Sequence, residues 1–479
     1  MSKASFSCDC EGPMKDFPHF WEHTVGSGHA TLALRADWQE QLRRCHKELG
    51  FRHVRFHGIL DDDMGTMVIV KNQPLYSFFN TDQIFDFLVS IGMKPLVELS
   101  FMPSGLSSGS RTAFHYNANV TPPKDYDAWA TLIGKLAEHW VERYGLKEVS
   151  QWPFEVWNEP NLKAFGSGKQ SEYFKLYQYT SLALKSVDVS LQVGGPVTAK
   201  NAWIPNFLDF CENQKLPVNF VSTHHYPTDA FGSPGDDTET QLAKSKRSIL
   251  REEAEKAKKE ALGKPLYYTE WSSSSNPRDK MHDEPYAACF ITKTIMEAQG
   301  LVECYSYWTF SDIFEENYFP SEPFQGGFGL LTINGIAKPA YRAYELLHDL
   351  GDHALPVRGS HKTVDLWVVQ AKGATTVLIT NFALPRHPVK TEDVLVKLKN
   401  FKKRPAKVRL RRIDEEHANA RKHWEGIGSP EYLSAATLKE LNKASKMVQE
   451  DLAFDYQNHE LAFTVSVPPL GIAAIELRF

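Results

Sequence analysis

Hydrophobic and polar positions follow two different periodic patterns along this chain. From about residue 15 to about residue 350, short apolar runs alternate with longer segments of helical spacing. The predicted strands lie near 24–34 and at 54–56, 95–99, 153–156, 191–194, 219–222, 265–269 and 302–308. Predicted helices include 38–49, 126–144, 171–185, 240–262 and 286–299. Eight strands that alternate with helices predict a (β/α)8 TIM barrel over residues 15–350.

The second pattern begins after residue 350, where apolar and polar residues alternate with period two. Turn residues separate the runs at 364–369, 375–380, 393–398, 408–413 and 461–467. This pattern predicts an accessory C-terminal antiparallel β-sandwich domain over residues 351–479. It carries a short helical insertion at 435–446, and residues 1–14 are a candidate addition to it.

Two predicted barrel strands end in a glutamate. The run from Phe154 is apolar, ends in Asn158 and Glu159, and is stopped at once by Pro160. A second apolar run, 265–271, delivers Glu270 in the same way. A surface carboxylate is the ordinary alternative, but a glutamate that closes an apolar strand has no obvious reason to face solvent. Two carboxylates at strand ends are the minimal equipment for breaking a glycosidic bond.

Charge and cysteine usage exclude several other classes of function. The net charge of −5 over 479 residues gives no electrostatic case for nucleic acid or for an anionic membrane. The basic stretch 397–412 could bind a polyanion, but a solvated strand face explains it better, because acidic residues 414–416 follow directly. Six scattered cysteines and the acidic run 61–63 lack the spacing of a metal site, so we expect no metal.

The chain shows no signal for export or membrane insertion. Its first residues lack the apolar segment of a signal peptide, and no run reaches the roughly 18 apolar residues of a membrane span. We therefore expect a cytoplasmic protein without a membrane partner.

Five runs, in this order, resemble glycoside hydrolase family 39, which is best known for β-xylosidases and α-L-iduronidases. They are HVRFHGILDDDMG, FEVWNEPN, VSTHHYP, YYTEWSSS and YSYWTFSDIFEE. The resemblance spans about residues 17–350, and the tail runs RIDEEHAN and GSPEYL are similar to the β-xylosidase branch. Asn-Glu-Pro alone marks a whole clan of barrel glycosidases, so the specific signal is the order of all five.

The resemblance implies a retaining double displacement that needs no cofactor or metal. Glu159 matches the general acid/base, and Glu270 matches the nucleophile. Glu159 must then hold a proton near neutral pH, while Glu270 must be ionised. We expect their carboxylates to lie about 5–5.5 Å apart, the separation of a retaining enzyme.

Two further residues match groups that act on the reacting atoms. Asn158 matches the residue that hydrogen-bonds the sugar 2-hydroxyl, although it could instead cap the turn after its strand. Tyr226 matches a phenol that holds the nucleophile in place, although a packed core tyrosine is the alternative.

The remaining candidates match residues that bind the sugar. Trp308 matches the aromatic floor beneath the apolar sugar face, and His57 and His224 match ligands of sugar hydroxyls. Glu316 matches another hydroxyl acceptor, and its neighbour Glu315 is the alternative for that position.

The predicted function is that of an exo-acting retaining glycosidase that releases xylose from xylooligosaccharides or aryl β-D-xylosides. An α-L-iduronidase or α-L-arabinosidase on the same scaffold is the alternative. A non-catalytic carbohydrate-binding barrel is disfavoured because both glutamates are present. The iduronidase branch carries a basic residue where this chain has Tyr226, which favours a neutral pentoside; Arg278 and Lys280 are the nearest cations along the sequence.

Overall fold

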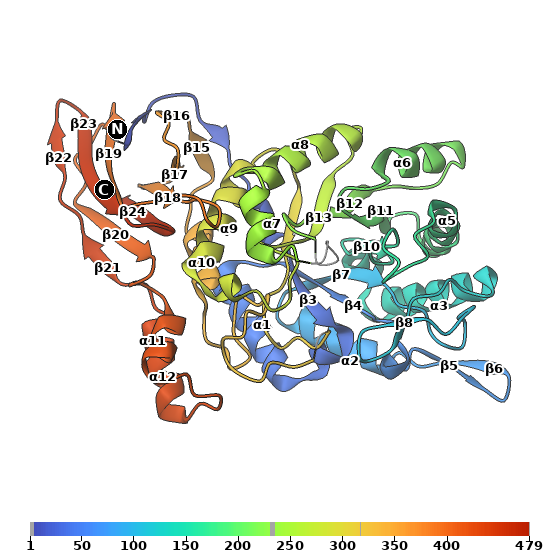
Figure 1. The fold of residues 1–479 in the computed structure, drawn as a ribbon. Coiled ribbons are helices and arrows are strands. Elements are labelled where there is room, and N and C mark those ends of the chain that lie inside the picture. The colour runs from blue at the N-terminus through green and yellow to red at the C-terminus, as the bar shows by residue number, and fades with distance from the viewer. Residues whose placement is uncertain (1–3, 230–234, 317, 479) are drawn as a thin grey trace.

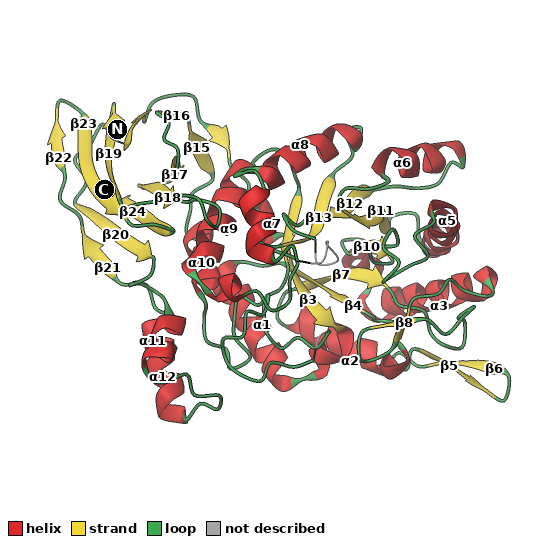
Figure 2. Cartoon of the chain, in the orientation of Figure 1, coloured by secondary structure: helices red, strands yellow, loops and turns green. Residues whose placement is uncertain are grey.

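The computed structural model describes residues 4–229, 235–316 and 318–478, and at its centre lies a closed barrel of parallel strands (Figures 1 and 2). Around the barrel the strands are β3 (Thr24–His29), β4 (His53–His57), β7 (Lys94–Leu99), β10 (Pro153–Val156), β11 (Gln192–Ala199), β12 (Phe220–His224), β13 (Leu266–Trp271) and β14 (Cys304–Tyr307). All eight predicted strands are present in this order, which confirms the TIM barrel.

Helices surround the barrel strands (Figure 2). They are α1 (Ala36–Leu49), α2 (Phe79–Ser90), α3 (Tyr126–Tyr144), α4 (Leu146–Val149), α5 (Gln170–Val187), α6 (Ile204–Asn213), α7 (Thr238–Lys244), α8 (Ile249–Glu260), α9 (Pro285–Glu297) and α10 (Pro339–His348). In α3, Trp129, Ile133, Leu136 and Trp140 recur at helical spacing and are buried. The Asp125 side chain accepts hydrogen bonds from the backbone amides of Asp127 and Ala128, so it caps the start of α3.

The helix predicted at 240–262 is two helices, α7 and α8, with a break at residues 245–248. Arg247 explains the break, because its guanidinium leaves the barrel surface and binds the C-terminal sheets. Its Nη1 lies 3.0 Å from Asp365 Oδ1, and its Nε donates to the carbonyl of Phe382. A long-range ion pair of this kind overrides the local helical pattern.

Two sheets pack face to face beside α9 and α10 (Figure 1). One contains β16 (Val357–Arg358), β1 (Ala4–Asp9), β19 (Glu392–Lys399), β23 (Glu460–Val467) and β22 (Asp455–Gln457). The other contains β2 (Lys15–Asp16), β15 (His353–Leu355), β17 (Val364–Ala371), β18 (Ala374–Asn381), β24 (Gly471–Arg478), β20 (Lys407–Ile413) and β21 (Gln449–Asp451). Alternate residues such as Val394, Val396 and Ile475 fill the core between them.

The predicted β-sandwich is thus present, with one departure from an antiparallel arrangement. Strand β1 runs parallel to β19, with Phe6 beside Val396. The period-two pattern of a strand does not reveal the direction of its partner, so sequence reasoning could not distinguish the two arrangements.

A helical insertion between β20 and β21 consists of α11 (Ala420–Gly426) and α12 (Ala435–Ala444). The second of these was predicted and the first was not. Trp424 and Leu441 from the insertion pack against Phe324 and Ile336, which lie in the loop after β14. Two short hairpins, β5 (Met67–Val70) with β6 (Gln73–Tyr76) and β8 (Thr112–Ala113) with β9 (Ala118–Asn119), complete the strands.

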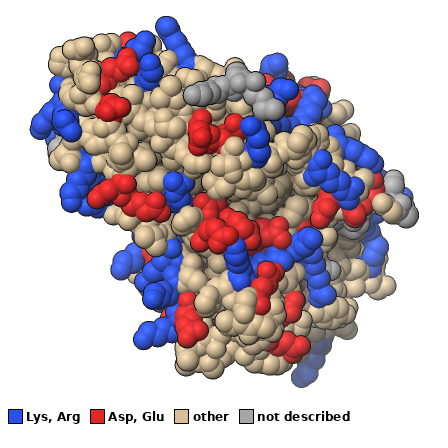
Figure 3. Space-filling view, turned by 60° about the vertical axis from the view of Figure 1, so that its left-hand side comes forward, with Lys and Arg blue, Asp and Glu red and all other residues tan. Residues whose placement is uncertain are grey.

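Charges of both signs are mixed on the surface. On the face that Figure 3 shows, lysine and arginine side chains are interspersed with aspartate and glutamate side chains. Within the basic stretch, Arg411 pairs with Asp349 at 2.6 Å and Arg412 with Glu450 at 3.6 Å. Across the described residues, none of the helices combines the length and the apolar character needed to cross a membrane.

Candidate active site

A pocket of about 520 Å³ opens at the carboxyl ends of the barrel strands. Every residue that the sequence assigned to the site lines it: His57, Asn158, Glu159, His224, Tyr226, Glu270, Trp308 and Glu316. Its size suits a small sugar or glycoside. Strand ends that are far apart in the sequence converge here because a parallel barrel brings all its carboxyl ends to one face.

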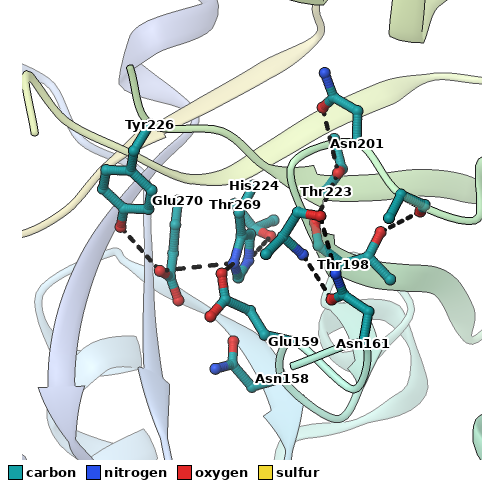
Figure 4. Close-up of polar contacts among 12 residues, drawn as sticks. Asn158, Glu159, Asn161, Thr198, Asn201, Thr223, His224, Tyr226, Thr269 and Glu270 are labelled. Carbon is teal, nitrogen blue, oxygen red and sulfur yellow. Dashed lines mark hydrogen bonds and ion pairs between the residues drawn. The ribbon is translucent and has the colours of Figure 1, made fainter. Parts of the chain in front are cut away.

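The turn after β10 directs Glu159 into the pocket. Trp157 and Glu159 have left-handed backbones, with φ of 73° and 42°, a conformation that is uncommon outside glycine. The amide of Glu159 donates a 2.9 Å hydrogen bond to the carbonyl of Val197 on β11, which holds the turn in this shape. Asn158 and Glu159 therefore both reach the pocket although they are adjacent in sequence (Figure 4).

Glu159 and Glu270 approach each other beside His224 (Figure 4). One oxygen of each carboxyl and Nδ1 of His224 all lie within 4.8 Å of one another. The Nδ1 atom is 3.0 Å from Glu159 Oε1 and 3.6 Å from Glu270 Oε2. An oxygen–oxygen distance of at most 4.8 Å is compatible with the roughly 5–5.5 Å between the two carboxyl groups of a retaining pair.

Protein donors hold Glu270 on both of its oxygens. The Tyr226 hydroxyl donates a 2.9 Å hydrogen bond to Oε2, and Arg55 Nη1 donates a 2.8 Å bond to Oε1. These two donors hold the Glu270 carboxyl in one orientation, as an attacking carboxylate must be held.

Arg55 is a fully buried arginine whose guanidinium binds groups from several strand ends. Besides Glu270, its Nε lies 2.6 Å from Glu155 Oε2, and its Nη2 lies 2.7 Å from Glu98 Oε2 and 2.9 Å from Asn158 Oδ1. Burial alone would lower the pKa of Arg55, but these carboxylates raise it, so the group stays charged. Sequence reasoning missed Arg55 and Glu155 and gave Glu98 no role; the available signal was a charge inside an otherwise apolar strand.

We expect Arg55→Met to destabilise the folded protein by about 3–5 kcal/mol, because it leaves Glu155 and Glu270 buried without their cation and leaves Glu98 with His57 alone. Urea unfolding of the variant and the parent protein measures this loss. The control is Arg251→Met, which breaks an exposed pair with Glu255 and should cost about 1 kcal/mol or less. Equal unfolding midpoints for the two variants would contradict the stabilising role of Arg55.

Burial sets the protonation of Glu159 and of its histidine partner. Burial raises the pKa of Glu159 to about 7, although His57 and Arg55 oppose the shift. Burial lowers the pKa of His224 to about 4, so its ring is neutral near pH 7. Nε2 of His224 lies 3.1 Å from Thr269 Oγ1. With both ring nitrogens against protein atoms, the arrangement favours a role in positioning Glu159 over the predicted contact with a sugar hydroxyl.

The pKa of Glu159 predicts how hydrolysis depends on pH. If Glu159 must donate a proton, kcat/KM for xylobiose should fall as pH rises through about 7. Burial raises the pKa of Glu316 to about 8, so this group could also cause the fall in kcat/KM. Variants of each glutamate show which of the two causes this alkaline limb of the pH profile. Glu159→Gln should remove the limb from the profile of an activated aryl xyloside, whereas Glu316→Gln should retain it. A limb that survives in Glu159→Gln belongs to another group.

At the far end of the pocket, Trp308 and Glu316 lie beside His57. The rings of Trp308 and His57 have centroids 4.8 Å apart, and Phe314 and Phe328 pack against Trp308. Burial would lower the pKa of His57, but Glu98, whose Oε2 is 2.7 Å from its Nδ1, raises it to about 9. Glu316 Oε1 is buried, 3.4 Å from His57 Nε2, and accepts no hydrogen bond from the described residues.

Of the two adjacent glutamates, Glu316 faces the pocket and Glu315 does not line it. Glu315 Oε1 instead lies 2.8 Å from Nδ1 of His29, whose Nε2 is 3.2 Å from Asp61. Burial would lower the pKa of His29, but its carboxylate partners raise it to about 11, so His29 is a cation that ties the loops after β4 and β14 to the end of β3. Although His29, Asp61 and Asp63 are close enough to share a metal ion, they form ion pairs in this arrangement.

A buried lysine fastens the loop that carries Glu316. Nζ of Lys338 lies 2.6 Å from both Asp283 and Asp312. These carboxylates accept the backbone amides of Gly326 and Gly329 at 2.6 and 2.7 Å. A side chain at Gly329 would meet the backbone of Asp312, so the loop follows one path. Sequence reasoning missed this cluster because its members are far apart in the chain.

The sequence model described as "Glycosyl hydrolases family 39" matches residues 6–458 of this chain. The chain belongs to glycoside hydrolase family 39. It is therefore a glycoside hydrolase, in a family whose reaction retains the anomeric configuration.

The similarity of this family 39 enzyme to β-xylosidases runs the length of the chain. A β-xylosidase from Caldicellulosiruptor saccharolyticus is 48% identical over 467 residues, covering 96% of this chain and 95% of that protein. The crystal structure of a monomeric β-xylosidase from Caulobacter crescentus CB15 matches with a TM-score of 0.88 and 31% identity, covering 99% of both chains. An α-L-iduronidase from Mus musculus is 28% identical over 203 residues, 39% of this chain and 30% of that protein, which makes it a more distant relative.

Proposed function

We propose that this enzyme is a retaining exo-β-xylosidase that releases xylose from xylooligosaccharides or aryl β-D-xylosides. The observation that carries the proposal is the close pairing of a buried Glu159, whose pKa burial raises to about 7, with a Glu270 held by Arg55 and Tyr226. The full-length similarity to β-xylosidases supports the choice of sugar.

In the first step, Glu159 donates its proton to the glycosidic oxygen while a Glu270 oxygen attacks the anomeric carbon. The bond from that carbon to the leaving oxygen breaks, the leaving group departs as an alcohol, and xylose is left covalently attached to Glu270. Tyr226 and Arg55 orient the attacking carboxylate, and both contacts loosen as its charge is used in the new bond.

In the second step, Glu159 is ionised and takes a proton from a water molecule. The resulting nucleophile attacks the anomeric carbon from the side the leaving group vacated, and Glu270 departs as a carboxylate. Two inversions restore the β configuration. His224 is neutral and lies 3.0 Å from Glu159, so it can contact Glu159 in both its protonated and its ionised form without adding a charge of its own.

The far end of the pocket suits the xylose ring itself. Trp308 offers an apolar surface, and Glu316 lines the same pocket. Asn158, whose Oδ1 is occupied by Arg55, keeps its amide nitrogen available for the 2-hydroxyl of the sugar. Such a contact strengthens as the ring approaches the oxocarbenium ion.

An α-L-iduronide is the second candidate, because a distant relative is an α-L-iduronidase. A uronate needs a cation in the pocket, since burying its charge unpaired would cost several kcal/mol. Among the described residues that line the pocket, the cations are His57 and Lys200, which pair with Glu98 and Asp229. Arg278 and Lys280 are exposed and lie outside this lining. The pocket therefore favours a neutral pentoside.

The test compares kcat/KM for 4-nitrophenyl β-D-xyloside with that for a chromogenic α-L-iduronide. We expect the xyloside to be preferred by about 100-fold or more, the equivalent of about 3 kcal/mol of unpaired charge. Equal rates, or a preference for the iduronide, would overturn the choice of sugar and leave the two-glutamate mechanism in place.

A further inference from the structure

The mouth of the active-site pocket contains residues that the double displacement does not use. Leu162, Ala164 and Phe165 line it from the loop between β10 and α5, and Phe114 lines it from the β8–β9 hairpin. These four side chains are neither fully buried nor fully exposed, so they present apolar surface to whatever occupies the mouth.

The loop between β10 and α5 lies on the leaving-group side of the scissile bond. The amide of Leu162 donates a 3.0 Å hydrogen bond to the carbonyl of Glu159, so the loop begins next to the proton donor. Glu159 must reach the glycosidic oxygen, and the group beyond that oxygen is the one that leaves. With xylose between Trp308 and Glu316, this leaving group extends toward Leu162 and Phe165.

Phe165 and Phe114 form an aromatic wall at this position. Their ring centroids lie 5.4 Å apart at an interplanar angle of 32°, and Tyr116 stacks behind Phe114 at 5.2 Å. The carbonyl of Phe165 accepts a 2.7 Å hydrogen bond from the Trp157 indole, which fixes the backbone beneath the ring. The wall is thus a supported surface of the kind on which a flat ring stacks.

A charged pair shares the pocket mouth with the aromatic wall. Lys200 follows β11 and forms an ion pair with Asp229, and their side chains are 54% and 37% exposed. Asn161 connects this end of β11 to the loop of Phe165, since its side chain bonds both backbone groups of Ala199 at 2.9 and 3.1 Å (Figure 4). The side chains of Lys200 and Asp229, which can hydrogen-bond sugar hydroxyls, therefore lie near the aromatic wall.

We propose that the aromatic wall of Phe165 and Phe114, together with Lys200 and Asp229, forms a leaving-group subsite that takes a six-membered ring. Stacking on the wall is common to a second xylose unit and to an aryl group. Lys200 and Asp229 can form hydrogen bonds with the hydroxyl groups of a xylose leaving group, which an aryl leaving group lacks. This inference rests on the proposed β-xylosidase function and specifies what lies beyond the scissile bond.

The experiment uses three donors that share the xylosyl group: xylobiose, 4-nitrophenyl β-D-xyloside and β-D-xylosyl fluoride. The fluoride has no ring beyond the scissile bond, so it cannot contact the wall. In Phe165→Ala, kcat/KM for xylobiose and for the aryl xyloside should each fall roughly tenfold relative to kcat/KM for the fluoride. Phe165→Leu keeps apolar volume and should show a smaller relative loss. Phe79→Ala, at a ring that is 80% exposed and outside the pocket lining, is the matched control.

Lys200→Met should affect a sugar leaving group and an aryl leaving group differently. It should lower kcat/KM for xylobiose roughly tenfold relative to the aryl xyloside, because only the sugar offers hydroxyls to the ammonium group. If Phe165→Ala lowers kcat/KM equally for all three donors, or for none of them, the wall is not a leaving-group subsite. If the parent enzyme hydrolyses none of the three donors, the β-xylosidase function fails instead, so the two failures are distinguishable.

Discussion

Glu270→Gly should lower the hydrolysis of every xyloside by about four orders of magnitude or more while substrate still binds. Its carboxylate forms the covalent bond to the anomeric carbon, and among the described residues no other carboxylate is bound by both Arg55 and Tyr226. Steady-state hydrolysis of xylobiose and of 4-nitrophenyl β-D-xyloside measures the loss, and calorimetric titration with xylose measures binding. The cavity left by glycine can admit azide, which should restore turnover of the aryl xyloside and give α-xylosyl azide.

Covalent labelling provides an independent check on the nucleophile. A 2-fluoro-xyloside with a good leaving group should trap the unmodified enzyme, and peptide mass spectrometry should locate the label on Glu270. A label on Glu98 or Glu316, which line or border the same site, would reassign the nucleophile.

Glu159→Ala should produce a loss that depends on the leaving group. Hydrolysis of xylobiose should fall by about 10²–10⁴, because its leaving alcohol needs a proton. An activated dinitrophenyl xyloside loses its phenolate without help, so its glycosylation should survive and the xylosyl enzyme should accumulate. Burst kinetics of the released phenol measure this difference.

Azide should rescue Glu159→Ala with the opposite stereochemistry to Glu270→Gly. The anion needs no general base, so it attacks the xylosyl enzyme and yields β-xylosyl azide. An α product, or hydrolysis of xylobiose at the parental rate, would show that Glu159 is not the acid/base. Glu316→Gln, at another buried carboxyl of the pocket, is the matched control and should give no azide product.

Sequence reasoning located the barrel strands and the glutamates because both leave local signals. A strand of the barrel interior is a short apolar run. Glu159 lies in the turn directly after such a run, and Glu270 lies near the end of another. Arg55 leaves a weaker signal, because a single charge inside HVRFH does not reveal its partners. Its three carboxylates come from β7, β10 and β13, and only the closed barrel brings them within reach.

The supporting contacts could not be predicted for the same reason. Lys338, Asp283 and Asp312 form one buried cluster, yet each is an ordinary charged residue in its own stretch of sequence. Arg247 breaks a helical pattern through a partner more than a hundred residues away, at Asp365. Local patterns specify elements, whereas pairings between distant side chains depend on the packed fold.

Strand β1 has a consequence for the order in which the protein can assemble on the ribosome. Its neighbours in the sheet are β16, at Val357–Arg358, and β19, at Glu392–Lys399. Residues 4–9 therefore wait, with Phe6 unburied, until all eight barrel strands have been translated. The barrel strands can find one another earlier, so the pairing of β1 with β16 and β19 is a late step. A nascent chain that stops before residue 392 would present an unpaired strand edge to chaperones and proteases.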